Sequence, residues 1–247
     1  MKKDKILITG FPHTGTSILK SKLGECTNVY EYPYEIDFLR PIELEGKGNK
    51  EFTLIKSPTI PIEIKKYGLS FLPESIYKDY IIIFVTRNPW YFFTSVYKSG
   101  EDPLRNETYH LHPGHGFRIE EYLTSIRLFL DASSGKYPDV YAIKYEDFFV
   151  DNFYQIKKII DNIGLKFEGD IFGQKSKDYI LIHGTNYKDI DESNITPKQR
   201  YIYRTWQINQ PFQNMNSDSD IPDELDDILK SSNMIKELGY TDPRITH

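Results

Sequence analysis

The sequence lacks the features that mark a membrane protein, a disulfide-linked protein or a cysteine-rich metal site. It contains one cysteine, Cys26, among 247 residues, which excludes an internal disulfide bond and a metal cage made of several thiolates. No run of about 18 apolar residues occurs, and the charged start MKKDK is not followed by an apolar signal region. We therefore expect a cytoplasmic protein without a membrane span, in which Cys26 is a buried structural thiol.

The chain also lacks an excess of positive charge. Its 31 Lys and Arg residues are outnumbered by 36 Asp and Glu residues, which gives a formal net charge of −5 at pH 7. This balance provides no global basic field for nucleic acid or an anionic membrane, so any anion site must be local. The length fits a single α/β domain over residues 1–247, in which residues 99–117 and 166–220 are expected to be lid or acceptor loops.

The first 23 residues are the most informative stretch of the chain. Residues 5–9 are a short apolar run typical of a buried strand, and residues 18–23 have the apolar spacing of a helix. Backbone N–H groups at a helix start have no partner within the helix, and the helix dipole adds positive potential there. The turn between strand and helix, GFPHTGTS, therefore predicts an anion site. Its candidate ligand-binding residues are Pro12, His13, Thr14, Gly15, Thr16 and Ser17.

This turn is similar to the nucleotide-binding P-loop but lacks its lysine. The pattern G-x-x-x-x-G-K-[ST] places a Lys against the terminal phosphates. Here Gly10 and Gly15 keep the spacing, and Thr16 stands at the Lys position. The turn thus favours a nucleotide whose 5′-phosphate is held while a group other than the γ-phosphoryl is transferred. An ordinary strand-to-helix turn is the alternative for this stretch alone.

Two other strands are expected to end in a cation. Residues 52–56 form a short strand that ends at Lys56, and the β-branched run at residues 80–86 is typical of a central parallel strand and precedes Arg87. Because ligands bind at the carboxyl edge of open α/β sheets, both side chains are candidates for a phosphate site. The alternatives are a Lys that extends into solvent and an Arg that pairs with a carboxylate.

Groups that could accept a proton occur in two places. Glu31 and Glu35 follow the first helix and are expected beside the phosphate turn, where transfer to a hydroxyl group needs a base. Each is alternatively a solvated surface residue. Three His residues lie in the polar loop 99–117, but their spacing is not a zinc signature, so we expect no metal. These His residues remain as reserve bases or exposed loop residues.

Strand and helix patterns alternate through the first two thirds of the chain, which predicts right-handed βαβ units. Asn88 and Pro89 are typical of an N-cap and a first helical position. Later helices are expected at residues 117–133, 152–163 and 221–238. We therefore predict an α/β fold in three layers, with a central parallel β-sheet flanked by helices, similar to that of P-loop NTPases.

Four stretches, in order and spacing, resemble the sulfotransferases that use 3′-phosphoadenosine 5′-phosphosulfate (PAPS). The turn at residues 10–17 resembles the 5′-phosphosulfate loop P-[RK]-S-G-T-[TS], and Lys56-Ser-Pro resembles the K-[ST]-P step. Arg87-Asn-Pro with Ser95 resembles the 3′-phosphate motif, in which a Ser follows eight residues after the Arg. Tyr145-Glu-Asp resembles the Y-E-D box, whose Tyr lies near the adenine.

The resemblance covers about residues 5–165 and implies how PAPS is held. One departure is His13, which stands where the family usually has Arg or Lys and carries full charge only when protonated. The family also closes the 3′ side with a basic segment late in the chain. Lys198 and Arg200 are the candidates for that segment.

The resemblance further implies transfer of a sulfuryl group from PAPS to a hydroxyl group of a carbohydrate or small molecule, without a metal. In that mechanism Lys56 stabilises charge on the bridging oxygen, and Glu31 or Glu35 accepts the acceptor proton. Two other functions stay open from the residues alone. They are a nucleotide-dependent kinase with an altered P-loop and a non-catalytic nucleotide-binding module.

Overall fold

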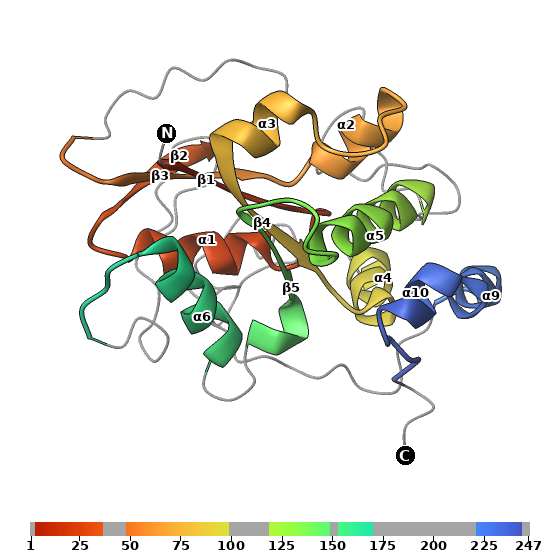
Figure 1. Cartoon of the computed structure of the whole chain (residues 1–247). Helices are drawn as coiled ribbons and strands as arrows, with labels where there is room; N and C mark the ends of the chain where they lie inside the picture. The colour runs from red at the N-terminus through yellow and green to blue at the C-terminus, as the bar shows by residue number, and fades with distance from the viewer. Residues whose placement is uncertain (1–2, 37–47, 99–118, 149–152, 170–220, 244–247) are drawn as a thin grey trace.

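The computed structural model describes residues 3–36, 48–98, 119–148, 153–169 and 221–243. Within these ranges a parallel β-sheet lies between two layers of helices, so the predicted three-layer α/β fold is confirmed (Figure 1). In the same ranges, no helix has the length and apolar character needed to cross a membrane.

Five parallel strands form the sheet in the order β2-β3-β1-β4-β5. The strands are β1 (Lys5–Gly10), β2 (Val29–Glu35), β3 (Phe52–Ser57), β4 (Tyr80–Thr86) and β5 (Val140–Lys144). Strand β1 lies at the centre and pairs with β3 on one side and β4 on the other. The turns that follow these three strands therefore meet at one edge of the sheet.

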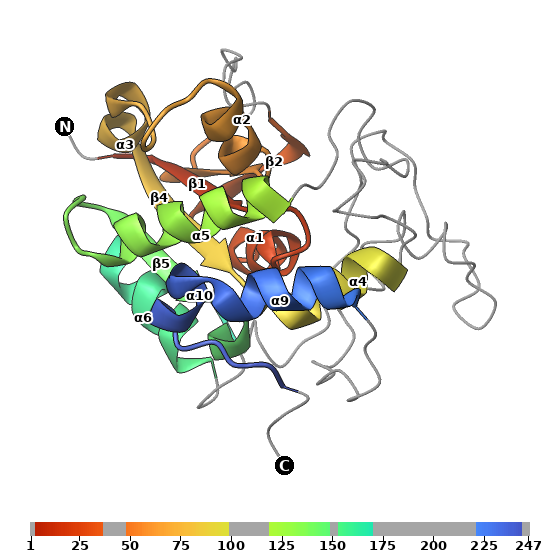
Figure 2. The ribbon, with the colours of Figure 1, turned by 90° about the vertical axis from the view of Figure 1, so that its right-hand side faces the viewer.

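The helices divide between the two faces of the sheet. They are α1 (Thr16–Gly24), α2 (Ile60–Lys66), α3 (Glu74–Asp79), α4 (Pro89–Lys98), α5 (Ile119–Ser133), α6 (Tyr154–Ile163), α9 (Asp223–Ser231) and α10 (Asn233–Glu237). A 3₁₀ helix, η1 (Tyr145–Phe148), follows β5. Residues of α1 and α6 pack in one core, and residues of α2, α5, α9 and α10 pack in the other. Figure 2 shows α9 lying beside α4, on the face of the sheet that α5 covers.

The alternating side chains of β4 explain why the strand is an unbroken apolar run. Successive side chains of a strand point to opposite faces. Ile82 and Phe84 belong to the core beneath α5, whereas Ile81, Ile83 and Val85 belong to the core beneath α1 and α6. Because both faces are covered by helices, all positions from Ile81 to Val85 are apolar.

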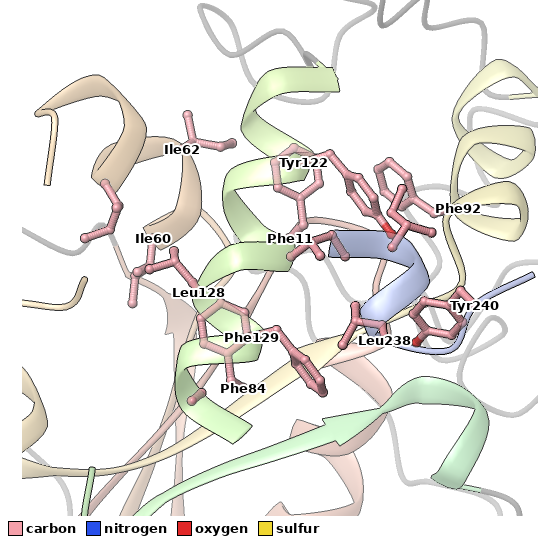
Figure 3. Packing of buried hydrophobic residues seen from close by; sticks show 14 of the residues in the cluster. Phe11, Ile60, Ile62, Phe84, Phe92, Tyr122, Leu128, Phe129, Leu238 and Tyr240 are labelled. Atoms are coloured by element: carbon pink, nitrogen blue, oxygen red, sulfur yellow. The ribbon is translucent and has the colours of Figure 1, made fainter. Parts of the chain in front are cut away.

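The core beneath α5 contains an aromatic cluster that reaches the end of β1 (Figure 3). The Phe11 ring is fully buried and meets the rings of Phe92 and Tyr122 edge-on, with centroids 5.5 and 5.7 Å apart. Phe11 is the first residue after β1, so this cluster anchors the start of the glycine turn to the core.

The single cysteine has the expected structural role. Cys26 is buried in the core beneath α1. Burial, with a smaller effect from the charge of Glu25, raises the pKa of its thiol to about 12. The thiol therefore stays protonated and packs as a small apolar side chain.

Three elements differ from the sequence-based expectations. The expected helix at 221–238 is wrong, because Ser232 has an extended backbone (φ −69°, ψ 116°) that separates α9 from α10. A straight helix would turn Ile235 about 120° away from Leu229, at about 100° per residue. The break brings Ile235 and Leu238 into the same core as Leu229.

Helices α2 and α3 were not predicted from the sequence. They have 7 and 6 residues, too few to show a repeating helical pattern of apolar side chains, and α2 carries a proline in its first turn. Strand β2 contains Pro33, which disfavours a central strand. The structure places β2 at an edge of the sheet, where a missing N–H group is tolerated.

We predict that Phe11→Ala lowers the free energy of unfolding by about 3–5 kcal/mol, because the change leaves a cavity among packed rings. Urea denaturation followed by circular dichroism measures this loss. Phe167→Ala is the matched control, since Phe167 is 36% exposed and its truncation should change stability by about 0.5 kcal/mol or less. Equal losses in the two variants would contradict the anchoring role of Phe11.

Candidate active site

The turn between β1 and α1 has a backbone that requires glycine at two positions. Gly15, the residue before α1, has a left-handed backbone with φ 100°. A Cβ atom on Gly10 would overlap the Val85 carbonyl oxygen and lie 2.9 Å from Thr14 Oγ1. Thr14 is fully buried, and its Oγ1 donates a hydrogen bond of 2.6 Å to the Phe11 carbonyl oxygen. The turn is therefore closed by its own threonine and admits no side chain at either glycine.

The start of α1 has the arrangement that an anion site needs. Among the described residues, no side chain caps the helix start through a hydrogen bond. Thr16 and Ser17 are its first two residues, and their backbone N–H groups belong to the first turn. His13 also has a positive φ, of 66°, which is uncommon for a residue with a side chain.

Lys56, Ser17 and Glu35 come together although they are far apart in the sequence. Lys56 lies near the end of β3, is 2% exposed, and its Nζ donates a hydrogen bond of 2.6 Å to Ser17 Oγ. The same Nζ forms an ion pair with Glu35 Oε1. Glu35 lies opposite Lys56 in the register of β2 and β3. The structure thus brings a cation, a hydroxyl group and a carboxylate to one side of the turn.

Glu31 lies in a different place from Glu35. Its Oε1 is 3.4 Å from the Nζ of Lys20, and its carboxylate covers Gly24 at the end of α1. The register of β2 on β3 shifts between the two carboxylates, so that Glu31 lies opposite Leu54 and Glu35 lies opposite Lys56. Glu35 forms an ion pair with Lys56, which bonds Ser17 of the turn, whereas Glu31 pairs with Lys20 farther along α1.

Lys20 is a buried residue that the sequence analysis missed. Its side chain is 1% exposed, and burial lowers the pKa of its ammonium group while the Glu31 carboxylate opposes this shift. Burial also raises the pKa of Glu31, and the charge of Lys20 opposes that shift. In the sequence, the burial of Lys20 is indicated only by its position next to Leu19, which forms the apolar face of the helix together with Leu23.

Arg87 flanks the turn on the side opposite Lys56, because it follows β4. Its Nη1 lies 3.4 Å from the His13 carbonyl oxygen, and its guanidinium carbon lies 4.9 Å from the centroid of the Tyr145 ring. Its Nε is buried and has no hydrogen-bond partner among the described residues. No carboxylate in those ranges forms an ion pair with Arg87, so the described part of the chain leaves a buried donor for a ligand.

Tyr145 connects the two sides of the candidate site. It begins η1 after β5, and its ring lies so close to Gly15 that a Cβ atom there would overlap it. Burial raises the pKa of its phenol, and the charge of Arg87 partly offsets the effect. The ring therefore fills the space that the missing side chain of Gly15 leaves, and it lies beside the guanidinium group.

The remaining candidates are distributed as follows. Asn88 caps α4 as expected, since its Oδ1 accepts a hydrogen bond of 3.0 Å from the Trp90 N–H group. Ser95 belongs to α4. Lys198, Arg200 and the three His residues of the 99–117 loop lie outside the described residues. In the part of the chain that the structure describes, no three His, Cys, Asp or Glu side chains are grouped to hold a metal ion.

Comparison with known proteins gives one family. A family model described as the sulfotransferase domain matches residues 3–195. Among solved structures, the chain is similar to the sulfotransferase domain from the curacin biosynthetic pathway. The two share 14% identity with a TM-score of 0.58, over 98% of this chain and 99% of that chain. Mouse sulfotransferase SULT7A1 complexed with PAP is similar over 69% of this chain and 62% of its own, with 16% identity and a TM-score of 0.40. A search of curated proteins gave no match.

We predict that Glu31→Gln lowers the free energy of unfolding by about 2 kcal/mol. Removing one partner of a fully buried pair costs about 3–5 kcal/mol, and Glu31 keeps 32% of its side chain exposed, which reduces the loss. The double change Lys20→Met with Glu31→Gln should recover most of it, because no charge then remains buried.

Urea denaturation of the wild type, Glu31→Gln and the double variant measures this loss and its recovery. Glu74→Gln is the control, since Glu74 pairs with Lys78 on the surface and its loss should leave the unfolding midpoint unchanged. A double variant less stable than Glu31→Gln would show that the two residues do not form a pair.

Proposed function

Because the chain belongs to the sulfotransferase family, we propose that it transfers a sulfuryl group from PAPS to a hydroxyl group of a carbohydrate or small-molecule acceptor. The observation that carries this proposal is the position of two cations around one glycine turn. Lys56 at the end of β3 bonds to Ser17, and Arg87 after β4 lies beside His13. A nucleotide with charged groups at both its 5′ and 3′ ends matches this arrangement.

The described residues fit a bisphosphate ligand on two grounds. Among the described residues no side chain caps the start of α1, so the N–H groups of its first turn are left for a phosphate. The buried Nε of Arg87 is a donor without a partner among the described residues, and such groups normally bind something. We assign the 5′-phosphosulfate to the turn and the 3′-phosphate to Arg87 with Ser95.

The other proposed donor-binding residues have supporting roles. Pro12, His13 and Thr14 would shape the turn, Tyr145 would contact the nucleoside, and Lys198 and Arg200 would close the 3′ side. His13 adds positive charge beside the turn only below its pKa. The proposal therefore depends on Lys56 as the cation of the 5′ side.

When bound, PAPS supplies the sulfuryl group, and its 3′,5′-bisphosphate leaves. The acceptor oxygen forms a bond to sulfur, the bond from sulfur to the bridging oxygen breaks, and the acceptor proton passes to a carboxylate. Lys56 and the N–H groups of the turn would stabilise the charge that develops on the bridging oxygen. One such donor is typically worth about 100- to 1000-fold in rate.

Glu35 is the better candidate for the base. Its carboxylate contacts Lys56, which bonds Ser17 of the phosphate turn. The carboxylate of Glu31 contacts Lys20 farther along α1. Geometry therefore favours Glu35, since a general base must lie within hydrogen-bond reach of the proton that it accepts.

We predict that 3′-phosphoadenosine 5′-phosphate raises the melting temperature much more than AMP does. A ligand at 100 times its dissociation constant adds about 2.7 kcal/mol of stability. Arg87→Ala should abolish the difference between the two nucleotides. Arg127→Ala is the matched control, because Arg127 is an exposed arginine of α5 that bonds only weakly to the Leu69 carbonyl oxygen.

The same panel, extended to ATP with Mg²⁺, tests the competing functions. Equal shifts for ATP and the bisphosphate would favour a kinase with an altered P-loop. Bisphosphate binding without transfer of labelled sulfate from PAPS to any member of a sugar and phenol panel would favour a non-catalytic module.

We predict that Glu35→Gln lowers kcat by about 100- to 10,000-fold, the usual contribution of a general base. Its affinity for the bisphosphate should change less than threefold, about 0.65 kcal/mol by the standard conversion, because the acceptor proton plays no part in donor binding. Glu31→Gln is the control, and its kcat should stay within about threefold of the wild-type value. Labelled-sulfate transfer and calorimetry separate the two effects, and a loss of turnover in Glu31→Gln alone would assign the base to Glu31.

A further inference from the structure

The peptide group between Arg87 and Asn88 is held from both sides. The Arg87 carbonyl oxygen accepts a hydrogen bond of 2.7 Å from the Tyr122 hydroxyl group. The Asn88 N–H group donates a hydrogen bond of 2.8 Å to Glu146 Oε1. These two groups belong to one planar peptide unit, so the two bonds fix its orientation. The direction in which the Arg87 side chain leaves the backbone is thereby restricted.

Glu146 is in turn held by the last part of the chain. Its Oε2 accepts a hydrogen bond of 3.1 Å from the Tyr240 hydroxyl group. Tyr240 is 8% exposed, and both its burial and the charge of Glu146 raise the pKa of its phenol, so it remains an O–H donor. The carbonyl oxygen of Thr241 accepts a hydrogen bond of 3.3 Å from Asn88 Nδ2. Thr241 thus contacts the turn after β4 directly, and Tyr240 reaches it through Glu146.

Other contacts fasten this segment to the sheet. Lys144, the last residue of β5, donates from its Nζ a hydrogen bond of 2.6 Å to the Leu238 carbonyl oxygen. The same ammonium lies 4.9 Å from the centroid of the Tyr240 ring. Trp90 Nε1 donates a hydrogen bond of 2.8 Å to Asp226 Oδ1 of α9. Helix α9 is therefore attached to α4 through Trp90, and the residue after α10 is attached to the end of β5 through Lys144. Figure 2 shows α9 beside α4.

We propose that Glu146 and Tyr240 are positioning residues that orient Arg87 toward a 3′-phosphate, so that the C-terminal segment sets the preference for 3′-phosphorylated nucleotides. The inference rests on the proposed function, which assigns the 3′-phosphate to Arg87. An arginine binds phosphate through a planar fork of donors, so its affinity depends on its orientation. Neither Glu146 nor Tyr240 needs to touch the nucleotide to have this effect. Tyr240 also lies outside the residues 3–195 that the family model matches.

A purely structural role for this network makes a different prediction. If the bonds served only to attach α9 and α10, their loss would lower stability and weaken all nucleotides equally. A positioning role weakens only ligands with a 3′-phosphate. The ratio of the dissociation constants for AMP and for 3′-phosphoadenosine 5′-phosphate therefore separates the two roles.

The test is calorimetric titration of both nucleotides into full-length Tyr240→Phe and Tyr122→Phe, each of which removes one hydroxyl group from one end of the network. We expect the dissociation constant for the bisphosphate to rise about tenfold in each variant, comparable to the loss of other outer-shell partners, and that for AMP to change less than twofold, about 0.4 kcal/mol. Tyr137→Phe is the matched control. The Tyr137 ring stacks on the Phe71 ring, with their centroids 4.0 Å apart, and neither residue belongs to the network around Arg87.

A double-mutant cycle completes the test. In an Arg87→Ala background, Tyr240→Phe should have no further effect on the bisphosphate, because the residue that it orients is absent. Parallel losses for AMP and the bisphosphate, or an unchanged ratio in Tyr240→Phe, would overturn the inference while leaving the proposed function intact. A wild-type protein that binds both nucleotides equally would overturn both.

Discussion

Strand β1 lies between β3 and β4, and the candidate site depends on this neighbourhood. All three strands run parallel, so their carboxyl ends meet at one edge of the sheet. The turn after β1 is thereby flanked by Lys56 from β3 and Arg87 from β4. Ligand sites in open α/β sheets form at this edge because the loops diverge there and leave backbone groups unpaired. In this chain, the closed glycine turn and the two cations occupy that edge together.

The site contains buried charge that contributes little to stability. Lys56 and Lys20 are both almost fully buried, and each is paired with a carboxylate of the edge strand β2. Desolvation offsets most of the attraction in such pairs. The register of β2 on β3 shifts between Glu31 and Glu35, and such irregularities commonly re-aim side chains next to functional sites. An ammonium group already held in position avoids reorganisation during a reaction.

Arg87 illustrates how distant parts of the chain prepare one side chain. Its peptide group is bonded by Tyr122 of α5 and Glu146 of η1, and Glu146 is bonded by Tyr240 near the C-terminus. These bonds measure 2.7, 2.8 and 3.1 Å, and the Tyr122 and Tyr240 side chains are buried. The turn after β4 therefore has less freedom than its position between a strand and a helix suggests.

Local patterns in the sequence were enough to predict strands β1, β3 and β4, helices α1, α4, α5 and α6, the glycine turn and the Asn88 cap. Each of these depends on residues within one turn or one strand, where periodicity and backbone preferences act. The spacing of Gly10 and Gly15, Lys56 near the end of β3, Arg87 after β4 and the Tyr145-Glu-Asp motif are of this kind. Patterns failed at Ser232, where the demands of the core overrode the regular spacing of a helix.

The pairings of charged and polar side chains were decided by tertiary structure alone. Nothing in the sequence distinguishes Glu35 from Glu31, yet one contacts Lys56 beside the turn and the other contacts Lys20 along α1. Likewise, the bond between Glu146 and Tyr240 joins residues 94 positions apart. Short-range preferences determine which backbone conformation a segment adopts, but contacts between segments follow from strand order and helix packing, which bury distant side chains together.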